Sequence, residues 1–366
     1  MHSTILVSLK KQSNAMVEAV NSVNFNKVKS QYKRNNSSKA ILVAMMLVIM
    51  LCLAVIAVCI GAYSISVGEV FGLIFDKIRG IEIPQLEESV IFNIRITRIL
   101  VAIGVGMALA SGGTIYQGIF HNPLIEPYIL GVSSGAAFGA AVSVIIRRPQ
   151  LIQVLAFIFG ILAVSLTYIL ARKNKRTSLI SLVLSGMIVS SVFSALVSYV
   201  QYTGNEEQLK VLVFWLMGGL YKSTWENVAV LIPVVIIGII IYRLSAWKLN
   251  VLSVGEDEAR ALGIRVERLK ILLMLVSTLV TSVAVSASGI IGWIGLMVPH
   301  AARMIVGPDN RYLIPFSAFL GGAFLVVCDT LARTLSTGEI PVSIISSLIG
   351  APYMIYLIRK HINKGR

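Results

Sequence analysis

The sequence predicts an all-α, polytopic membrane protein with about ten transmembrane helices. Of its 366 residues, 56% are hydrophobic and 13% are charged, whereas an average soluble domain has about 25% charged residues. Apolar runs recur along almost the whole chain after residue 40. Many of them are long enough to cross a hydrocarbon core of about 30 Å, which takes about 20 helical residues. The loops between them leave no room for a large soluble domain.

The predicted spans are apolar runs bounded by charged residues, Gly, Pro and Asn. The glycine-rich stretch "SASGIIGWIG" is expected to form the turn between the seventh and eighth spans. The predicted spans cover residues 41–62, 96–115, 125–146, 151–170, 179–201, 227–244, 268–287, 292–306, 312–334 and 341–359.

The positions of Lys and Arg support this count, because basic residues accumulate in the cytoplasmic loops of membrane proteins. With the amino terminus inside, most of the 32 Lys and Arg residues fall on inner segments, such as "RKNKR" and residues 243–270. Both termini are therefore expected on the cytoplasmic side of the membrane. The net charge of +15 reflects this topology. We expect no nucleic-acid partner, since the basic residues are not interleaved with aromatic ones along a groove.

Residues 1–40 are polar and basic, and residues 41–366 form the predicted transmembrane domain. Because 40 residues precede the first apolar run, we expect a mostly disordered cytoplasmic tail and no cleaved signal peptide. Cys52, Cys59 and Cys328 lie in apolar runs and lack the spacing of a disulfide or metal motif. No metal and no cofactor is expected.

Small residues at four-residue spacing predict close helix packing, which in lipid depends on such residues. A flexible hinge is the alternative explanation of the glycines. The two sets are Gly131, Gly135 and Gly139 in "GVSSGAAFG", and Ala102, Gly106 and Ala110 in the second span.

The stretch "QGIFHNPLIEPYILG", residues 117–131, carries helix-breaking residues between two apolar segments. Asn122 and Pro123 are expected to end one helix and Pro127 to start the next. Broken backbone at membrane depth must be buried in protein or line water, so we expect a re-entrant turn. Proton transfer by His121 is the alternative, but no second histidine or acid stands at helical spacing to accept the proton.

A second break is expected at Pro299 in "GWIGLMVPHAARMIVG", where His300 follows directly. An intramembrane enzyme using His300 is an alternative, although a histidine with only Arg303 nearby is poor material for acid–base chemistry. Asp329 is the clearest acid within a span, and it stands four residues before Arg333, at ion-pair spacing. An ion-coupled secondary transporter usually needs an intramembrane carboxylate without such a partner. The sequence therefore argues against ion coupling.

Four stretches of the chain resemble one known family, in order, from about residue 60 to the end. They are "RITRILVAIGVGMALASGGTIYQGIFHNPLIEPYILGVSSGAAFGA", "GEDEARALGI", "SGIIGWIGLMVPHAARMIVGPDNR" and "EIPVSIISSLIGAPYMIYLI". The chain resembles the permease subunits of ABC importers for iron-siderophore complexes, haem and cobalamin. This resemblance implies a location in the plasma (inner) membrane of a prokaryote. The resemblance implies a type II importer fold, in which spans two to five and seven to ten form an inverted repeat. It also implies three kinds of partner: a second permease subunit, usually an identical copy, a cytoplasmic ABC ATPase dimer and an external substrate-binding protein.

The stretch "GEDEARALG" has acids in its first turn and Gly263 as a stop, which predicts a short exposed helix in the longest inner loop. In the family the matching loop, here about residues 250–267, docks into the ATPase. A helix lying on the membrane surface is the alternative. The residues expected to couple to the ATPase are Gly255, Glu256, Asp257, Glu258, Ala259, Arg260, Leu262 and Gly263.

Arg95, Arg98 and Arg333 lie at the predicted outer ends of their spans. Cations cost about 2.5–3.5 kcal/mol at the bilayer centre, so these arginines belong at the interface. In the family the matching positions meet carboxylates on the binding protein. The alternatives are that Arg333 pairs with Asp329 and that Arg95 reaches lipid headgroups.

The fifth span carries small hydroxyl residues on several faces, and in the family this span lines the central path. Thr177, Ser178 and Ser181 are the expected gate residues at its inner end. Ordinary packing of serines between helices explains the pattern nearly as well.

The chain has no GxxxxGK[ST] loop that could cradle a nucleotide, so we expect a transport subunit, with ATP hydrolysed by a partner. The expected cargo is an iron complex, with a ferric siderophore first and haem or cobalamin as alternatives.

Overall fold

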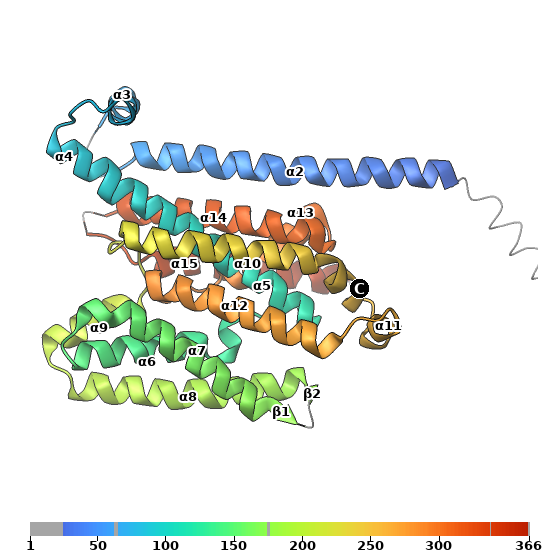
Figure 1. Ribbon diagram of the computed structural model, residues 1–366. Helices are drawn as coiled ribbons and strands as arrows, with labels where there is room; N and C mark the ends of the chain where they lie inside the picture. Colours follow the sequence, from blue (N-terminus) through green and yellow to red (C-terminus); the bar gives the residue numbers. More distant parts are fainter. Residues whose placement is uncertain (1–24, 62–64, 174–175, 337, 365–366) are drawn as a thin grey trace, which may run out of the picture. The chain divides into compact units, whose positions relative to one another are not determined.

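The computed structural model describes residues 25–61, 65–173, 176–336 and 338–364. The chain forms two compact units, residues 1–45 and 46–366. The described part of the first unit is the amino-terminal portion of helix α2. The described residues of the second unit form helices joined by short connections, with one two-residue antiparallel pair in which Arg172 faces Thr177. Its helices are labelled in Figure 1.

The elements follow one another along the chain with short connections. They are α2 (Phe25–Cys59), α3 (Val67–Arg79), α4 (Gln85–Glu88), the π-helix η1 (Ser89–Ile96), α5 (Thr97–Phe120), the 3-10 helix η2 (Pro127–Leu130), α6 (Val132–Ile145), the 3-10 helix η3 (Pro149–Leu151), α7 (Ile152–Ala171), β1 (Arg172–Lys173), β2 (Arg176–Thr177), α8 (Leu179–Thr203), α9 (Glu206–Leu216), α10 (Trp225–Leu252), α11 (Glu256–Ala261), α12 (Val266–Ser288), α13 (Ile294–Val306), α14 (Asn310–Thr334) and α15 (Val342–Lys364).

Each predicted span coincides with an apolar helix in the described part of the chain. Seven of these helices are long and apolar enough to cross a membrane, whereas α6, α13 and the apolar part of α15, Val342–Leu357, are shorter. The chief difference is that α2 begins at Phe25, not near residue 41. Residues 25–40 contain no Gly or Pro that would end a helix. The rest of the predicted tail, residues 1–24, lies outside the described residues.

Two helices that the apolar runs did not predict are α3 and α9. Both are fixed by capping boxes, in which Ser66 pairs with Glu69 and Asn205 with Gln208. The helix α3 then ends at Gly80, which adopts the left-handed conformation. The sequence "SVGE" at its start matches the capping-box pattern, from which the start of α3 could have been predicted.

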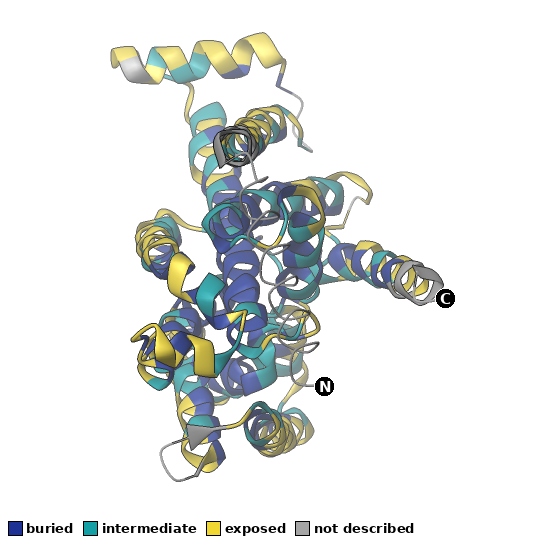
Figure 2. Ribbon diagram, turned by 90° about the vertical axis from the view of Figure 1, so that its right-hand side faces the viewer, coloured by how far each residue is buried: buried dark blue, intermediate teal, exposed yellow. Residues whose placement is uncertain are grey.

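Helix α5 is the centre of the second unit, and most of its residues are buried. It packs against α10, α12, α13 and α14. Figure 2 shows buried residues along the middle of the bundle and exposed ones on the helices around it. A second group, α6, α7 and α8, packs together beside it. A Cβ on Gly135 or Gly139 of α6 would meet α7 backbone at 2.3 Å and 2.2 Å. These glycines therefore serve close packing.

The closest approach in this core joins Gly113 of α5 to Gly295 of α13. A Cβ on Gly113 would stand 1.9 Å from the Gly295 carbonyl oxygen. Pro299 lies four residues after Gly295 and has no N–H to donate back to that carbonyl. Contrary to the expectation, Pro299 does not break the span, because it lies inside α13. The Gly295 carbonyl, which Pro299 leaves without a helical donor, lies against Gly113, where there is no side chain.

The chain turns between α5 and α6. His121 adopts the left-handed conformation after α5, and Asn122 Oδ1 accepts a hydrogen bond from the Leu124 amide at 2.9 Å. Pro127 is buried and starts η2, and the Tyr128 hydroxyl donates to the Ile291 carbonyl at 2.9 Å. The η2 end of the turn is thus packed against protein, whereas His121, Pro123 and Leu124 at its start are exposed, contrary to the expectation of a turn buried throughout.

The same sequence of elements recurs in the second half. A long helix, α5 or α12, is followed by a break and a short helix, α6 or α13. This recurrence fits the inverted repeat, since the two long helices would cross the membrane in opposite directions.

Candidate functional site

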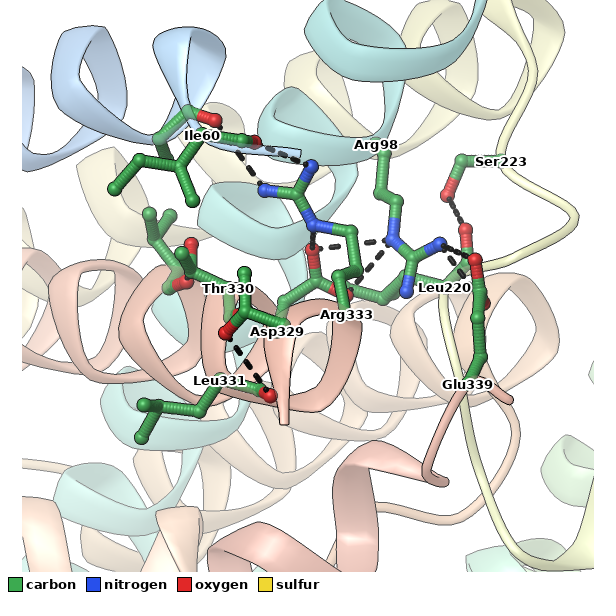
Figure 3. Close-up of polar contacts among 12 residues, drawn as sticks. Ile60, Arg98, Leu220, Ser223, Asp329, Thr330, Leu331, Arg333 and Glu339 are labelled. Atoms are coloured by element: carbon green, nitrogen blue, oxygen red, sulfur yellow. Dashed lines mark hydrogen bonds and ion pairs between the residues drawn. The ribbon is translucent and has the colours of Figure 1, made fainter. Parts of the chain in front are cut away.

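The predicted outer ends of α5 and α14 carry a cluster of buried charges (Figure 3). Arg98 Nε donates to both oxygens of Asp329, at 2.9 Å and 3.1 Å, and Arg98 Nη1 donates to Glu339 Oε1 at 2.8 Å. Arg333 Nε lies 3.2 Å from Asp329 Oδ2. The Asp329 side chain is 1% exposed and that of Glu339 is 50% exposed. Two guanidinium groups therefore face two carboxylates, which compensates the buried charge.

Arg333 and a third arginine, Arg95, cap the end of α2. Arg333 Nη1 and Nη2 donate to the carbonyls of Ile60 and Ala57, at 3.2 Å and 3.3 Å. Arg95 Nη1 donates to the Val58 carbonyl at 2.9 Å. The last carbonyls of a helix lack helical donors, and the helix dipole favours cations there. Arg95 and Arg333 therefore bind α2 to the bundle.

In the structure Arg98 and Arg333 thus both contact Asp329, whereas Arg95 contacts the end of α2. The Arg333–Asp329 ion pair is the arrangement that the sequence analysis gave as the alternative to docking of a binding protein. In this conformation the guanidinium groups face inward, and docking of a binding protein stays a prediction. Glu339 was missed, because it stands 241 residues from Arg98 in the sequence and no local spacing joins them.

The predicted inner helix exists as α11, Glu256–Ala261, between the ends of α10 and α12. Ala259 is buried in the same core cluster as Leu252 and Ile264. Glu256 pairs with Arg260 at 2.7 Å and also with Lys270 at the start of α12. The Lys270 hydrogen bond is the chief reason that the pKa of Glu256 is lowered.

The other face of this segment is open. Asp257 and Glu258 are exposed, as are the apolar residues Val254 and Leu262 on either side of the helix. Gly263 ends the turn in the left-handed conformation, with its amide bonded to the Arg260 carbonyl at 2.9 Å. A helix seated on the core by Ala259 therefore exposes two acids and two apolar side chains on its other side.

A polar link, which no local spacing predicts, joins the end of α10 to the start of α14. Asn250 of α10 donates to Asp309 Oδ1 at 2.6 Å and accepts from the Asn310 amide at 2.8 Å. Asp309 caps α14 and pairs with Arg311 at 2.7 Å. Burial raises the pKa of Asp309, but the hydrogen bonds from Arg311 and Asn250 outweigh it and lower that pKa to about 2. The base of α10, from which α11 projects, is thereby fixed to α14.

The expected gate residues lie at the start of α8. Ser178 Oγ accepts the Ser181 amide at 3.1 Å and donates to Ser181 Oγ at 2.8 Å. Ser178 is therefore an N-cap, and the pair has a structural role. Thr177 lies in β2, and its side chain is outside the described residues.

Helix α8 exposes hydroxyl residues along one side. Ser191, Ser194 and Ser198 are exposed and recur every three or four residues, the spacing of one helix face. Ser191 Oγ donates to the Met187 carbonyl of its own helix at 2.8 Å. Exposed apolar residues, among them Leu184 and Tyr199, flank this stripe.

The model of the FecCD transport family matches residues 44–360 of the chain. The chain is 40% identical to the molybdate import system permease protein MolB of Haemophilus influenzae, over 84% of this chain and 92% of that protein. It is 43% identical to the cobalamin import system permease protein BtuC of Halobacterium salinarum, over 76% of this chain and 75% of that one. A metal-chelate type ABC transporter solved in an inward-facing conformation has a similar fold, with TM-score 0.78, 37% identity and coverage of 87% of this chain and 98% of the other. The chain therefore belongs to the FecCD transport family and is a membrane-spanning permease of an ABC importer.

Proposed function

We propose that this permease imports an iron complex into the cytoplasm, using ATP hydrolysed by a partner. The observation that carries the proposal is α11, a seated helix with an open charged and apolar face, on a chain without a nucleotide-binding loop. An ABC ATPase dimer docks on α11 from the cytoplasm. Both termini of the permease lie on that side of the plasma membrane, and residues 255–263 transmit the movement of the ATPases to α10 and α12.

A second, identical permease chain completes the path. The exposed stripe of Ser191, Ser194 and Ser198 supports this assignment, because hydroxyl groups suit a facing helix or a water-filled passage better than lipid tails. Thr177, Ser178 and Ser181 at the inner start of α8 form the gate of this passage.

The external binding protein docks over the outer charge cluster. Glu339 is the replaceable partner of Arg98, because it is half exposed while Asp329 is fully enclosed. A carboxylate of the binding protein would exchange with Glu339 on the Arg98 guanidinium. Substituting Glu339 with Gln would weaken the internal competitor and tighten docking, whereas unchanged affinity would contradict the exchange.

The cargo is an iron complex, first a ferric siderophore and then haem or cobalamin. The cobalamin system of the relative BtuC supports a bulky chelate, and the molybdate system of the relative MolB extends the cargo range of such relatives to an oxyanion. Uptake of each radiolabelled compound in cells that lack and regain this gene would identify it.

The decisive test is reconstitution in vesicles. Uptake should require the permease, the ATPase, the binding protein and ATP together, and the permease alone should accumulate nothing. Uptake by the permease alone on a proton or sodium gradient would establish the alternative, an ion-coupled secondary transporter. The pairing of Asp329 with two arginines argues against that alternative.

A further inference from the structure

Two adjoining cavities lie between the first turns of α7 and α10 and the last turn of α12. Their volumes are about 350 Å³ and 250 Å³. In the proposed topology these helix ends lie on the outer side of the membrane. Five residues line both cavities, which are therefore continuous: Gln153, Glu226, Asn227, Ser286 and Ala287.

The larger cavity is a polar recess with one cation and one carboxylate. Lys222 and Glu226 line it, together with Gln150 and Thr224. The Lys222 ammonium lies 5.8 Å from the centroid of the Tyr221 ring. Within the described residues, neither Lys222 nor Glu226 forms a salt bridge, so both charges are available to a ligand.

The smaller cavity is an apolar groove. Val154 and Phe157 of α7, Val230 of α10 and Val283 of α12 line it. Further along the same helix faces lie exposed aliphatic residues: Ile158 and Leu162 on α7, Ile237, two turns after Val230, on α10, and Leu279 on α12. The groove therefore leads from the polar recess onto an apolar side of the bundle.

The depth of the site fits the membrane interface. Trp225, the first residue of α10, is exposed beside the recess, and tryptophan is enriched where headgroups meet hydrocarbon. A polar recess at headgroup level above an apolar groove has the amphipathic profile of one lipid molecule.

We propose that this site binds a phospholipid with a zwitterionic, ammonium-bearing headgroup. Glu226 receives the ammonium and Lys222 the phosphate, and an acyl chain lies along Val154, Val230 and Val283. The carboxylate sets the selectivity, because an ammonium forms an ion pair with Glu226, whereas the headgroup of an anionic lipid offers Glu226 only a hydroxyl and no cation. The proposal needs the chain to span the membrane and does not depend on its cargo.

Native mass spectrometry of the delipidated permease, titrated with phosphatidylethanolamine or phosphatidylglycerol, tests this selectivity. The first phosphatidylethanolamine should bind roughly two- to fivefold more tightly than phosphatidylglycerol, the size of one partly exposed ion pair. Glu226→Gln should abolish this preference. Lys222→Gln should weaken both lipids and preserve the preference, because both carry a phosphate. The matched control is Glu207→Gln, an exposed acid in the first turn of α9, which should change neither.

A photoreactive group placed at Gln153 identifies the occupant in native membranes. An adduct with the mass of a phospholipid is expected. A cross-link to a protein, an equal affinity of the wild-type chain for both lipids, or an unaltered preference in Glu226→Gln would overturn the proposal.

Discussion

At the scale of single residues, Asp329 is a buried carboxylate whose charge must be compensated within the protein. It is enclosed and holds two arginines, each of which also binds elsewhere: Arg98 on Glu339 and Arg333 on the end of α2. Removing one partner of a buried ion pair leaves an uncompensated charge, which costs far more than the pair itself contributes.

Asp329→Asn should therefore destabilise the permease by about 3–5 kcal/mol, measured by denaturant unfolding in detergent. The control is Glu88→Gln, which breaks the pair of Lys77 and Glu88, whose side chains are 50% and 34% exposed. That change should lower the free energy of unfolding by less than about 1 kcal/mol. Similar losses in the two variants would show that Asp329 does not hold the cluster.

Two adjacent glycines give a second prediction. Gly113→Ala places a methyl group against the Gly295 carbonyl and should destabilise the protein by about 1–3 kcal/mol. Gly112→Ala is the matched control, because its nearest neighbours stand at 3.4 Å and 3.5 Å. It should be neutral or slightly stabilising, since alanine favours a helix. The test compares the thermal unfolding midpoints of the two variants. Equal midpoints would refute the tight contact between Gly113 and Gly295.

At the scale of elements, α11 is held by Ala259 in the core and by Glu256, which pairs with Arg260 and Lys270. The pKa of Glu256 is lowered in the folded chain, chiefly by the hydrogen bond from Lys270. A lowered pKa means that this contribution is present above the ordinary glutamate pKa and is lost as the pH falls through the folded value.

Amide exchange of residues 254–263, corrected for intrinsic rates, should therefore rise between about pH 5 and pH 3. In Glu256→Gln the segment should exchange faster at neutral pH, and this rise should be absent. A pH response in the variant equal to that of the wild type would assign the effect to another group.

At the scale of the whole molecule, the exposed faces of α7 and α8 differ in character. If the hydroxyl stripe of α8 meets a second copy, Ser198→Cys should form a disulfide-linked dimer in oxidised membranes. The background would lack Cys52, Cys59 and Cys328. Ile158→Cys on the exposed side of α7 is the control and should stay monomeric. Cross-linking at Ile158 and not at Ser198 would move the dimer interface to α7.

The sequence by itself determined the helical membrane fold, the positions of the apolar helices and the short helix at 256–261. These features depend on local properties, namely the length of an apolar run, the residues that start and stop a helix, and the loop charges. The capping boxes at Ser66 and Asn205 also depend on local sequence, so the starts of α3 and α9 could have been predicted from it.

The tertiary structure alone decided which polar groups meet. Glu339 on Arg98, Asn250 on Asp309, and Arg95 on the end of α2 join residues far apart in the chain. It also decided that α13 continues through Pro299, and that the Gly295 carbonyl, which Pro299 has no N–H to bond, packs against Gly113. Local spacing carries no information about such pairs, since they depend on how distant helices pack.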